Sequence, residues 1–262
     1  TPHSSALLQK KLRCRKTISH DKTCHPYQTI FVSFLTLPIM TTENIHDQAF
    51  KELIQECFKE FMELFWPEES KEIDFRTIHF LQQEMSTDHG PGQGNERKMD
   101  IVAEVKTKGE LRHILVHIEH QSKRESNFPN RMFNYYCQLW LRHQKPIFPI
   151  ALFSDDHKWR KPIDNYFEII ALNKRTLRFD YELIKLKNLN WRDFIASSNP
   201  IVAALMAKMG FKTEEIPRVK AEIARILTGR EMKYSKIEYL FNFSDFYLPL
   251  TDKNSILIYE EA

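Results

Sequence analysis

The sequence is poor in glycine and cysteine and has no long apolar run, and each shortage argues against a class of protein. Only 6 of the 262 residues are Gly and only 4 are Cys. The cysteines have no C-x-x-C spacing, which argues against a disulfide framework or a Cys-rich zinc site and predicts a reducing, cytoplasmic setting. No segment approaches the roughly 18 apolar residues that a membrane span requires, so we expect no membrane insertion.

Three of the six glycines lie together in residues 89–95, but they do not form a phosphate-binding loop. The G-x-G-x-x-G and Walker spacings are absent, and no helical pattern follows. Pro91 also removes a backbone donor from the segment. We therefore interpret this segment as a flexible connection.

The net charge of +3 is not spread evenly along the chain. Residues 1–39 contain six basic residues and one acidic residue, which is +5, so the remainder carries 3 − 5 = −2. Bulk charge therefore gives no indication of nucleic-acid binding by the folded part, and a local basic patch would have to supply it.

Residues 1–39 also lack a steady helical or strand period, and we expect a non-native or disordered leader. A basic stretch precedes an apolar one, as in a signal peptide, but no small-residue cleavage site follows. We favour read-through upstream of a natural start at Met40, with a genuine extension or an export signal as the alternative.

From Asn44 onward the hydrophobic pattern predicts alternating helices and strands. With 42% hydrophobic and 28% charged residues, the chain has enough apolar material for a substantial core. The first helix shows apolar residues at i, i+3, i+4 and i+7 up to Phe65 and ends at Pro67. The predicted elements that follow are strands at 75–85, 98–107 and 111–121, a helix at 126–143 and a strand at 147–153.

The two strands at 98–107 and 111–121 form a hairpin with a derivable register. If Gly109 and Glu110 are the loop, the numbers of paired residues sum to 219. One side of the hairpin is then apolar, and the other pairs Asp100 with Glu119. The remaining pairs on that second side are Val102 with His117, Glu104 with Leu115 and Lys106 with His113.

The strand at 147–153 follows a helix, so a right-handed crossover places it parallel to the strand ending at Gln121. The fold class is therefore α/β. Strands are expected near 166–171 and 177–186, and helices near 191–195, 200–209 and 214–227. We divide the chain into the leader 1–39, a core at 40–186 and a mainly helical C-terminal extension at 187–262.

Asp100 and Glu119 suggest a metal site. Directly paired residues of an antiparallel sheet have Cβ atoms about 4.5–5.5 Å apart, so two carboxylates repel unless a cation lies between them. Mg²⁺ is typically held by one or two carboxylates together with waters and phosphate oxygens. Gln121 is on the same side, and its amide could position a water or a phosphate oxygen but could not act as a base.

The pattern Asp100, Glu119-x-Gln121, between a first and a second helix, resembles the PD-(D/E)XK nuclease superfamily. Within it, the sequence is most similar to the Rpn family of recombination-promoting nucleases, often labelled putative transposases, in which Gln replaces the superfamily Lys. The flanking segments that carry the likeness are 46–53, 131–136, 149–155, 199–204 and 246–249.

The resemblance implies a restriction-endonuclease-like core of helix, three antiparallel strands, helix and parallel strand. It also implies a DNA endonuclease dependent on Mg²⁺ or Mn²⁺ and connected with recombination or a mobile element, with DNA as partner. Asp100 and Glu119 would be metal ligands and Gln121 would occupy the Lys position. Candidates for an accessory acid or a DNA contact are Asp47, Lys51, Glu52, Glu56, Arg131 and Tyr135. The oligomeric state stays open, with a homodimer as one option.

Other interpretations of these residues remain. Asp100 and Glu119 could be ordinary surface charges. The pair His117-x-Glu119 is half of a two-histidine, one-carboxylate iron site, which would need a distant His. A zinc deaminase is excluded, because no P-C-x-x-C follows. The alternative from a non-enzyme class is a nuclease fold that has lost activity and binds DNA or protein.

Overall fold

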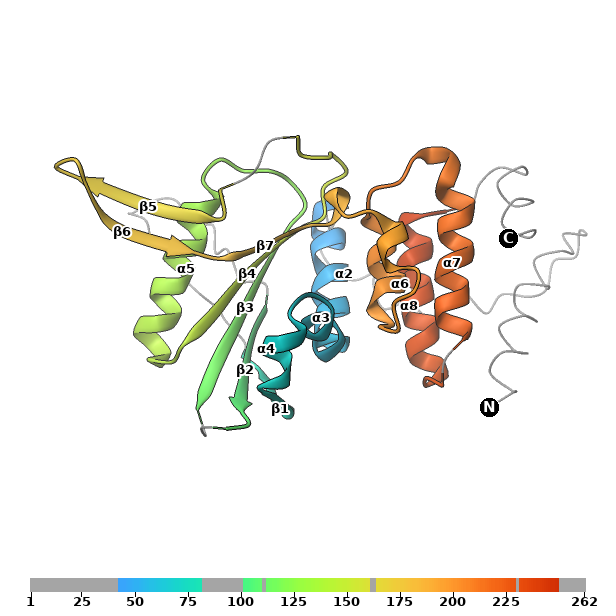
Figure 1. Ribbon diagram of the computed structural model, residues 1–262, viewed down its shortest axis with the longest axis horizontal. Coiled ribbons are helices and arrows are strands. Elements are labelled where there is room, and N and C mark those ends of the chain that lie inside the picture. Colours follow the sequence, from blue (N-terminus) through green and yellow to red (C-terminus); the bar gives the residue numbers. More distant parts are fainter. Residues whose placement is uncertain (1–41, 82–100, 110–111, 161–163, 230, 250–262) are drawn as a thin grey trace, which may run out of the picture.

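The computed structural model describes residues 42–81, 101–109, 112–160, 164–229 and 231–249. Within them a five-stranded mixed sheet separates one long helix from the remaining helices (Figure 1). The N-terminal helices are α2 (Thr42–Glu56), α3 (Phe58–Phe65) and α4 (Pro67–Lys71). The expected single helix is interrupted at Cys57, whose φ of −123° and ψ of 32° are not helical. No helix in these residues is long and apolar enough to cross a membrane.

The main sheet has the order β1-β2-β3-β4-β7. Its strands are β1 (Ile73–Phe80), β2 (Ile101–Thr107), β3 (His113–Gln121), β4 (Ile147–Phe153) and β7 (Glu182–Lys185). The first three strands are antiparallel, and β4 runs parallel to β3 after helix α5 (Phe128–His143). This is the expected order of helix, three antiparallel strands, helix and parallel strand, so the restriction-endonuclease-like arrangement is confirmed.

The predicted hairpin register is confirmed over the described pairs. Lys106 lies opposite His113 and Ile101 lies opposite Ile118, and the pairs between them follow the same sum. Alternate residues therefore face opposite sides of the sheet, as the period of two requires. Asp100 lies outside the described residues.

The segment 177–186 was predicted to be one strand, and this is wrong. Strand β6 (Lys174–Asp180) pairs with β5 (Tyr166–Ala171) in a separate two-stranded sheet, whereas β7 joins the main sheet beside β4. Tyr181 lies between the two strands, and its ring is buried. Its N–H donates to the carbonyl of Asn165, and its O–H donates to the carbonyl of Asp164. The hairpin of β5 and β6 packs on α5, where Phe133 stacks on Phe167.

The C-terminal part is helical, as expected, with α6 (Ile201–Leu205), α7 (Ile216–Thr228) and α8 (Tyr234–Tyr247). Short 3₁₀ turns occupy 186–188, 191–194, 206–208 and 213–215. The expected helix at 191–195 is one of these turns, and α8 had not been predicted as a separate element. One continuous core joins α2 and α3, the adjacent sheet face and the three C-terminal helices. Helix α5 covers the opposite sheet face (Figure 1).

Candidate functional site

Glu119 and Gln121 lie near the carboxyl end of β3 and face helix α5. Their neighbours Ile118 and His120 point to the other side of the sheet, where Ile118 joins the main core. Glu119 is only 5% exposed. A carboxylate buried to this extent needs a compensating charge or hydrogen bonds, so it is not an ordinary solvated surface charge.

Arg131, from the second turn of α5, brings the polar groups of this site together. Its Nε lies 3.5 Å from Oε1 of Glu119. Its two terminal nitrogens donate to Oε1 of Gln121 and to the carboxylate of Glu125. Nε2 of Gln121 also donates to Glu125 over 3.3 Å. We call Glu119, Gln121, Glu125 and Arg131 the Arg131 cluster.

His117 lies one step back along β3 on the same face. It is fully buried, its Nε2 is 3.6 Å from Oε2 of Glu119, and its ring meets that of Tyr135 edge to face. Burial lowers the pKa of His117 from 6.5 to about 3, so the imidazole is neutral near pH 7. The positive charge beside Glu119 therefore comes from Arg131 and not from His117.

The accessory residues proposed on α2 approach from the other side of the sheet. Oδ1 of Asp47 lies 3.2 Å from Nδ1 of His120, and Nε2 of His120 is 2.7 Å from Oγ of Ser154. Glu52 is exposed and accepts a hydrogen bond from Gln48 one turn earlier. Lys51 is half-buried on the same helix. The contacts of the described residues thus do not bring these three α2 side chains into the Arg131 cluster.

Asp47, His120 and Ser154 have the carboxylate, imidazole and hydroxyl order of a serine hydrolase. The hydroxyl residue is only 3% exposed, and its N–H donates to the carbonyl of Gln121. The ring of His120 stacks on Phe50 of α2 with centroids 4.3 Å apart. We interpret this chain of contacts as a link that holds α2 against the ends of β3 and β4.

Tyr135 was a candidate DNA contact, and the structure places it in the core. Its side chain is 1% exposed and packs with Val102, Leu115 and Leu139 under α5. A contact with a nucleic-acid backbone would require the ring to leave this packing. We therefore do not carry Tyr135 further as a DNA contact.

Among the described residues, no group of three or more His, Cys, Asp or Glu side chains is placed to hold a metal ion. The distant His that the iron-site interpretation needs is therefore not found in that part of the chain. Asp100, the predicted partner of Glu119, lies outside it. The pairing of Asp100 with Glu119 stays a prediction.

The oxygen donors of the Arg131 cluster suit a hard divalent cation. Glu119 and Glu125 offer carboxylates and Gln121 offers an amide oxygen, and such oxygens are the ligands that Mg²⁺ takes in proteins. Glu125 was missed in the sequence analysis, because it follows the end of β3 and belongs to no strand or helix pattern. Its proximity to Gln121 and Arg131 becomes visible only in three dimensions.

The model of a family described as "Putative transposase, YhgA-like" matches residues 44–238, which is well over half of the chain. No curated protein and no solved structure matches.

Proposed function

We propose that this chain, which belongs to the family of YhgA-like putative transposases, is a metal-dependent DNA endonuclease. The family description connects it with mobile elements, and transposition requires contact with DNA. The finer proposal is hydrolysis of phosphodiester bonds with Mg²⁺ or Mn²⁺ in DNA recombination or movement of a mobile element.

The observation that carries the proposal is the gathering of Glu119, Gln121 and Arg131 where β3 ends beneath α5. Burying a carboxylate and a guanidinium together contributes little net stability, since the cost of desolvation offsets the attraction. Buried charged groups of this kind concentrate at functional sites.

Each residue has a distinct proposed role. Glu119, together with Asp100 in the register derived from the sequence, would hold the metal ion, which would neutralise charge on the scissile phosphate. The amide of Gln121 would orient a water or a phosphate oxygen, because it has both a donor and an acceptor but no charge. Arg131 compensates Glu119 and Glu125 in the metal-free protein, and its fork of donors suits a phosphate group.

The test is relaxation of supercoiled plasmid by highly purified protein with Mg²⁺, Mn²⁺ or EDTA. We expect cleavage only with a divalent metal, and loss of cleavage in Asp100→Asn and Glu119→Gln. Gln121→Ala should slow cleavage without preventing Mg²⁺ from raising the thermal midpoint. The matched control is Glu63→Gln, a carboxylate change on the exposed side of α3.

Two results would contradict the proposal. Cleavage at an equal rate in the wild type and both carboxylate variants would indicate a contaminating host nuclease or another site. Absence of cleavage by the wild type with every metal would favour the inactive nuclease fold that binds DNA or protein.

A further inference from the structure

A pocket lies beyond the Arg131 cluster, where β3 and β4 end. Its volume is about 510 Å³, and its walls include Lys123 and Arg124 after β3 and, after β4, residues 154–157 and Trp159. His46 of α2 and Lys208 of the 3₁₀ turn after α6 close it. Parallel strands bring the loops at their carboxyl ends to one edge of the sheet, which is where ligands bind in open α/β folds.

The pocket contains a lysine that is nearly withdrawn from water. Lys208 is 9% exposed, and its Nζ donates to Oδ1 of Asp156 over 2.6 Å. The same ammonium lies 5.1 Å from the centre of the ring of Tyr247, at the end of α8. A buried ammonium costs free energy unless negative charge compensates it. Its carboxylate partner is largely exposed, with a side chain 73% accessible to water, which weakens the compensation.

Two further lysines, Lys185 and Lys187, act on Asp156 without lining the pocket. Lys185 is 5% exposed, donates to the carbonyl of Asp155, and lies 4.9 Å from the Trp159 ring. Burial lowers the pKa of Lys185 and of Lys187, and the charge of Lys208 lowers both further. Burial works to raise the pKa of Asp156, but Lys208, Lys187 and Lys185 together hold it below its ordinary value. Lys185 is paired with the carboxylate of Asp155 and Lys208 with that of Asp156, yet the lysines still repel one another, and an added anion would relieve that repulsion.

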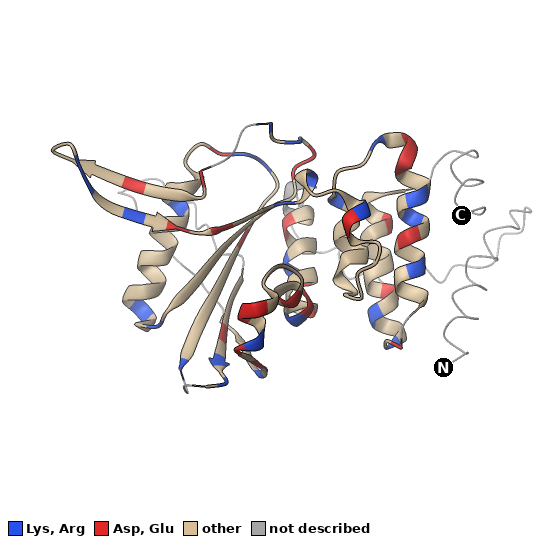
Figure 2. Ribbon diagram, viewed as in Figure 1, with Lys and Arg blue, Asp and Glu red and all other residues tan. Residues whose placement is uncertain are grey.

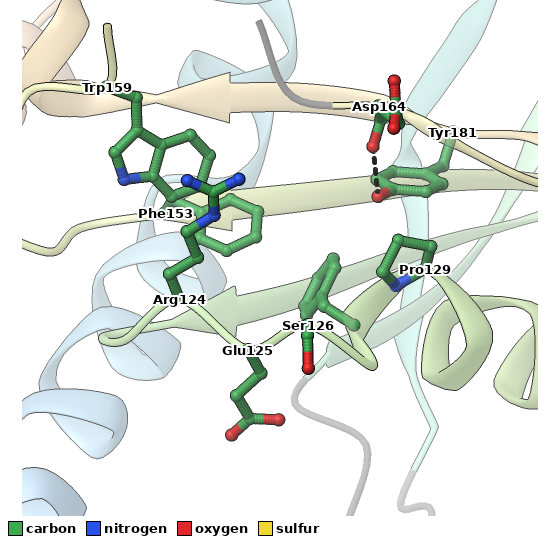
Figure 3. Close-up of a pocket in the computed structure, with 9 residues that line it drawn as sticks. Arg124, Glu125, Ser126, Pro129, Phe153, Trp159, Asp164 and Tyr181 are labelled. Carbon is green, nitrogen blue, oxygen red and sulfur yellow. Dashed lines mark hydrogen bonds between the residues drawn. The ribbon is translucent and has the colours of Figure 1, made fainter. Parts of the chain in front are cut away.

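The outer wall adds two exposed cations. Arg124 lies over the ring of Trp159, with 5.4 Å from its guanidinium carbon to the ring centre. Figure 3 shows these two residues in the wall of a neighbouring pocket, which they also line. A guanidinium that lies over an aromatic ring keeps its donors available for a planar or tetrahedral anion. Lys123 precedes it in the chain. Lys123, Arg124 and Lys208 therefore line the pocket together with Asp155 and Asp156, and Lys185 and Lys187 add positive charge near Asp156.

The charge of this pocket is local. Figure 2 shows basic and acidic residues interspersed along α7 on one side of the sheet, whereas α5 on the other side carries basic residues and no acidic one. The pocket is also close to the candidate site, because Lys123 is two residues after Gln121 and two residues of extended chain span at most about 7 Å. A ligand in the pocket and a ligand at the Arg131 cluster could belong to one molecule.

We propose that this pocket binds a phosphate group of the nucleic-acid strand on which the Arg131 cluster acts. The proposal rests on the proposed function for the identity of the ligand. Lys208 supplies a fixed positive charge, and Lys123 and Arg124 close over the phosphate from outside. The phosphate can be an internal phosphodiester or the phosphate at a strand end, and the two sources differ in charge and accessibility.

The test is binding of a single-stranded DNA oligonucleotide, labelled at its 3′ end, measured by fluorescence anisotropy in EDTA. The double variant Lys123→Ala/Arg124→Ala should raise the Kd about tenfold, because two charge-assisted contacts are lost. The slope of log K against log salt should fall by about 0.7, the value for one phosphate contact on a single strand. The matched control is Lys59→Ala/Lys71→Ala, two exposed lysines of α3 and α4, for which we expect a change below about twofold.

A second variant tests the buried lysine without removing it. Asp156→Asn leaves Lys208 in place but removes the carboxylate that competes with a bound phosphate, so it should tighten binding. Inorganic phosphate should compete with the oligonucleotide in the wild type and compete less in Lys123→Ala/Arg124→Ala. Comparison of 5′-phosphate and 5′-hydroxyl oligonucleotides identifies the source, since only a strand-end site loses affinity without the terminal phosphate.

Equal loss of affinity in the two double variants would show that bulk charge alone drives binding and would overturn the proposal. Unchanged affinity in Lys123→Ala/Arg124→Ala would overturn it as well. Because EDTA is present throughout, the result does not depend on cleavage. A protein that loses binding in the pocket variant yet never cleaves DNA would contradict the nuclease function and leave the phosphate site standing.

Discussion

Nε of Arg131 lies 3.5 Å from Oε1 of Glu119, and this contact joins helix α5 to the carboxyl end of β3. Both side chains are nearly buried, with 12% and 7% exposure. The same guanidinium reaches Gln121 and Glu125. In the metal-free protein, Arg131 therefore provides the positive charge at the place where we propose that a divalent cation binds.

Replacement of Arg131 by Gln should destabilise the metal-free protein. Removing one partner of a buried ion pair leaves the other charge uncompensated, which costs on the order of 3 kcal/mol. Mg²⁺ should then raise the thermal midpoint of Arg131→Gln more than that of the wild type, since the metal replaces the missing charge. The measurement is urea unfolding in EDTA and thermal unfolding with and without Mg²⁺. Arg142→Gln, an exposed change on the same helix, is the control, and an equal loss in both variants would contradict this account.

Gln121→Lys should be poorly tolerated while Arg131 is present. The amide oxygen of Gln121 accepts from Arg131, and a lysine would remove that acceptor and place a second cation beside the guanidinium. The double variant Gln121→Lys/Arg131→Gln should recover both stability and cleavage. Unfolding and plasmid cleavage of the four proteins form a double-mutant cycle, with an expected coupling of about 0.5–3 kcal/mol. Additive effects would show that Arg131 and a lysine at position 121 do not compete for the same place.

His117 should make the protein sensitive to acid. Its pKa is about 3 in the folded chain and near 6.5 when exposed, so between these values the unfolded chain binds a proton that the folded chain does not. The unfolding free energy should therefore fall as the pH drops below about 6.5, by about 1.4 kcal/mol per pH unit from this group. Urea unfolding at pH 7 and pH 5 in EDTA, compared with His117→Leu, isolates the contribution. An identical loss in both proteins would refute it.

Gly210→Ala should destabilise the fold near the pocket. A Cβ at this position would lie 2.7 Å from the carbonyl oxygen of Lys187 and 3.0 Å from that of Leu189. Both neighbours are backbone atoms, so the chain must shift, at a cost of about 1–3 kcal/mol. Gly109→Ala is the control, because nothing lies within 4 Å of a Cβ there. Thermal unfolding of both variants checks the prediction, and similar midpoints would count against it.

The hydrophobic pattern of the sequence was sufficient to predict the structure of segments that follow a single helix or strand periodicity. Alternation in β2 and β3 predicted their register, because a shift of one residue would turn the apolar set away from the core. The bounds of β4 and β5 were also predicted correctly. The prediction of one strand at 177–186 was wrong. The strand periodicity of β6 and β7 continues through Tyr181, while the chain passes there from the two-stranded sheet to the main sheet.

For the candidate site, the sequence by itself determined that Glu119 and Gln121 share a face of β3 and that β3 and β4 end at the same edge. Only the tertiary structure decided which side chains meet them there. Glu125, in the turn after β3, and Arg131, in helix α5, both contact Gln121. Asp47 contacts His120 from the opposite face of the sheet. Lys208 enters the pocket from a segment more than eighty residues after Lys123. Such contacts depend on how helices pack on the sheet, and no local period along the chain encodes that packing.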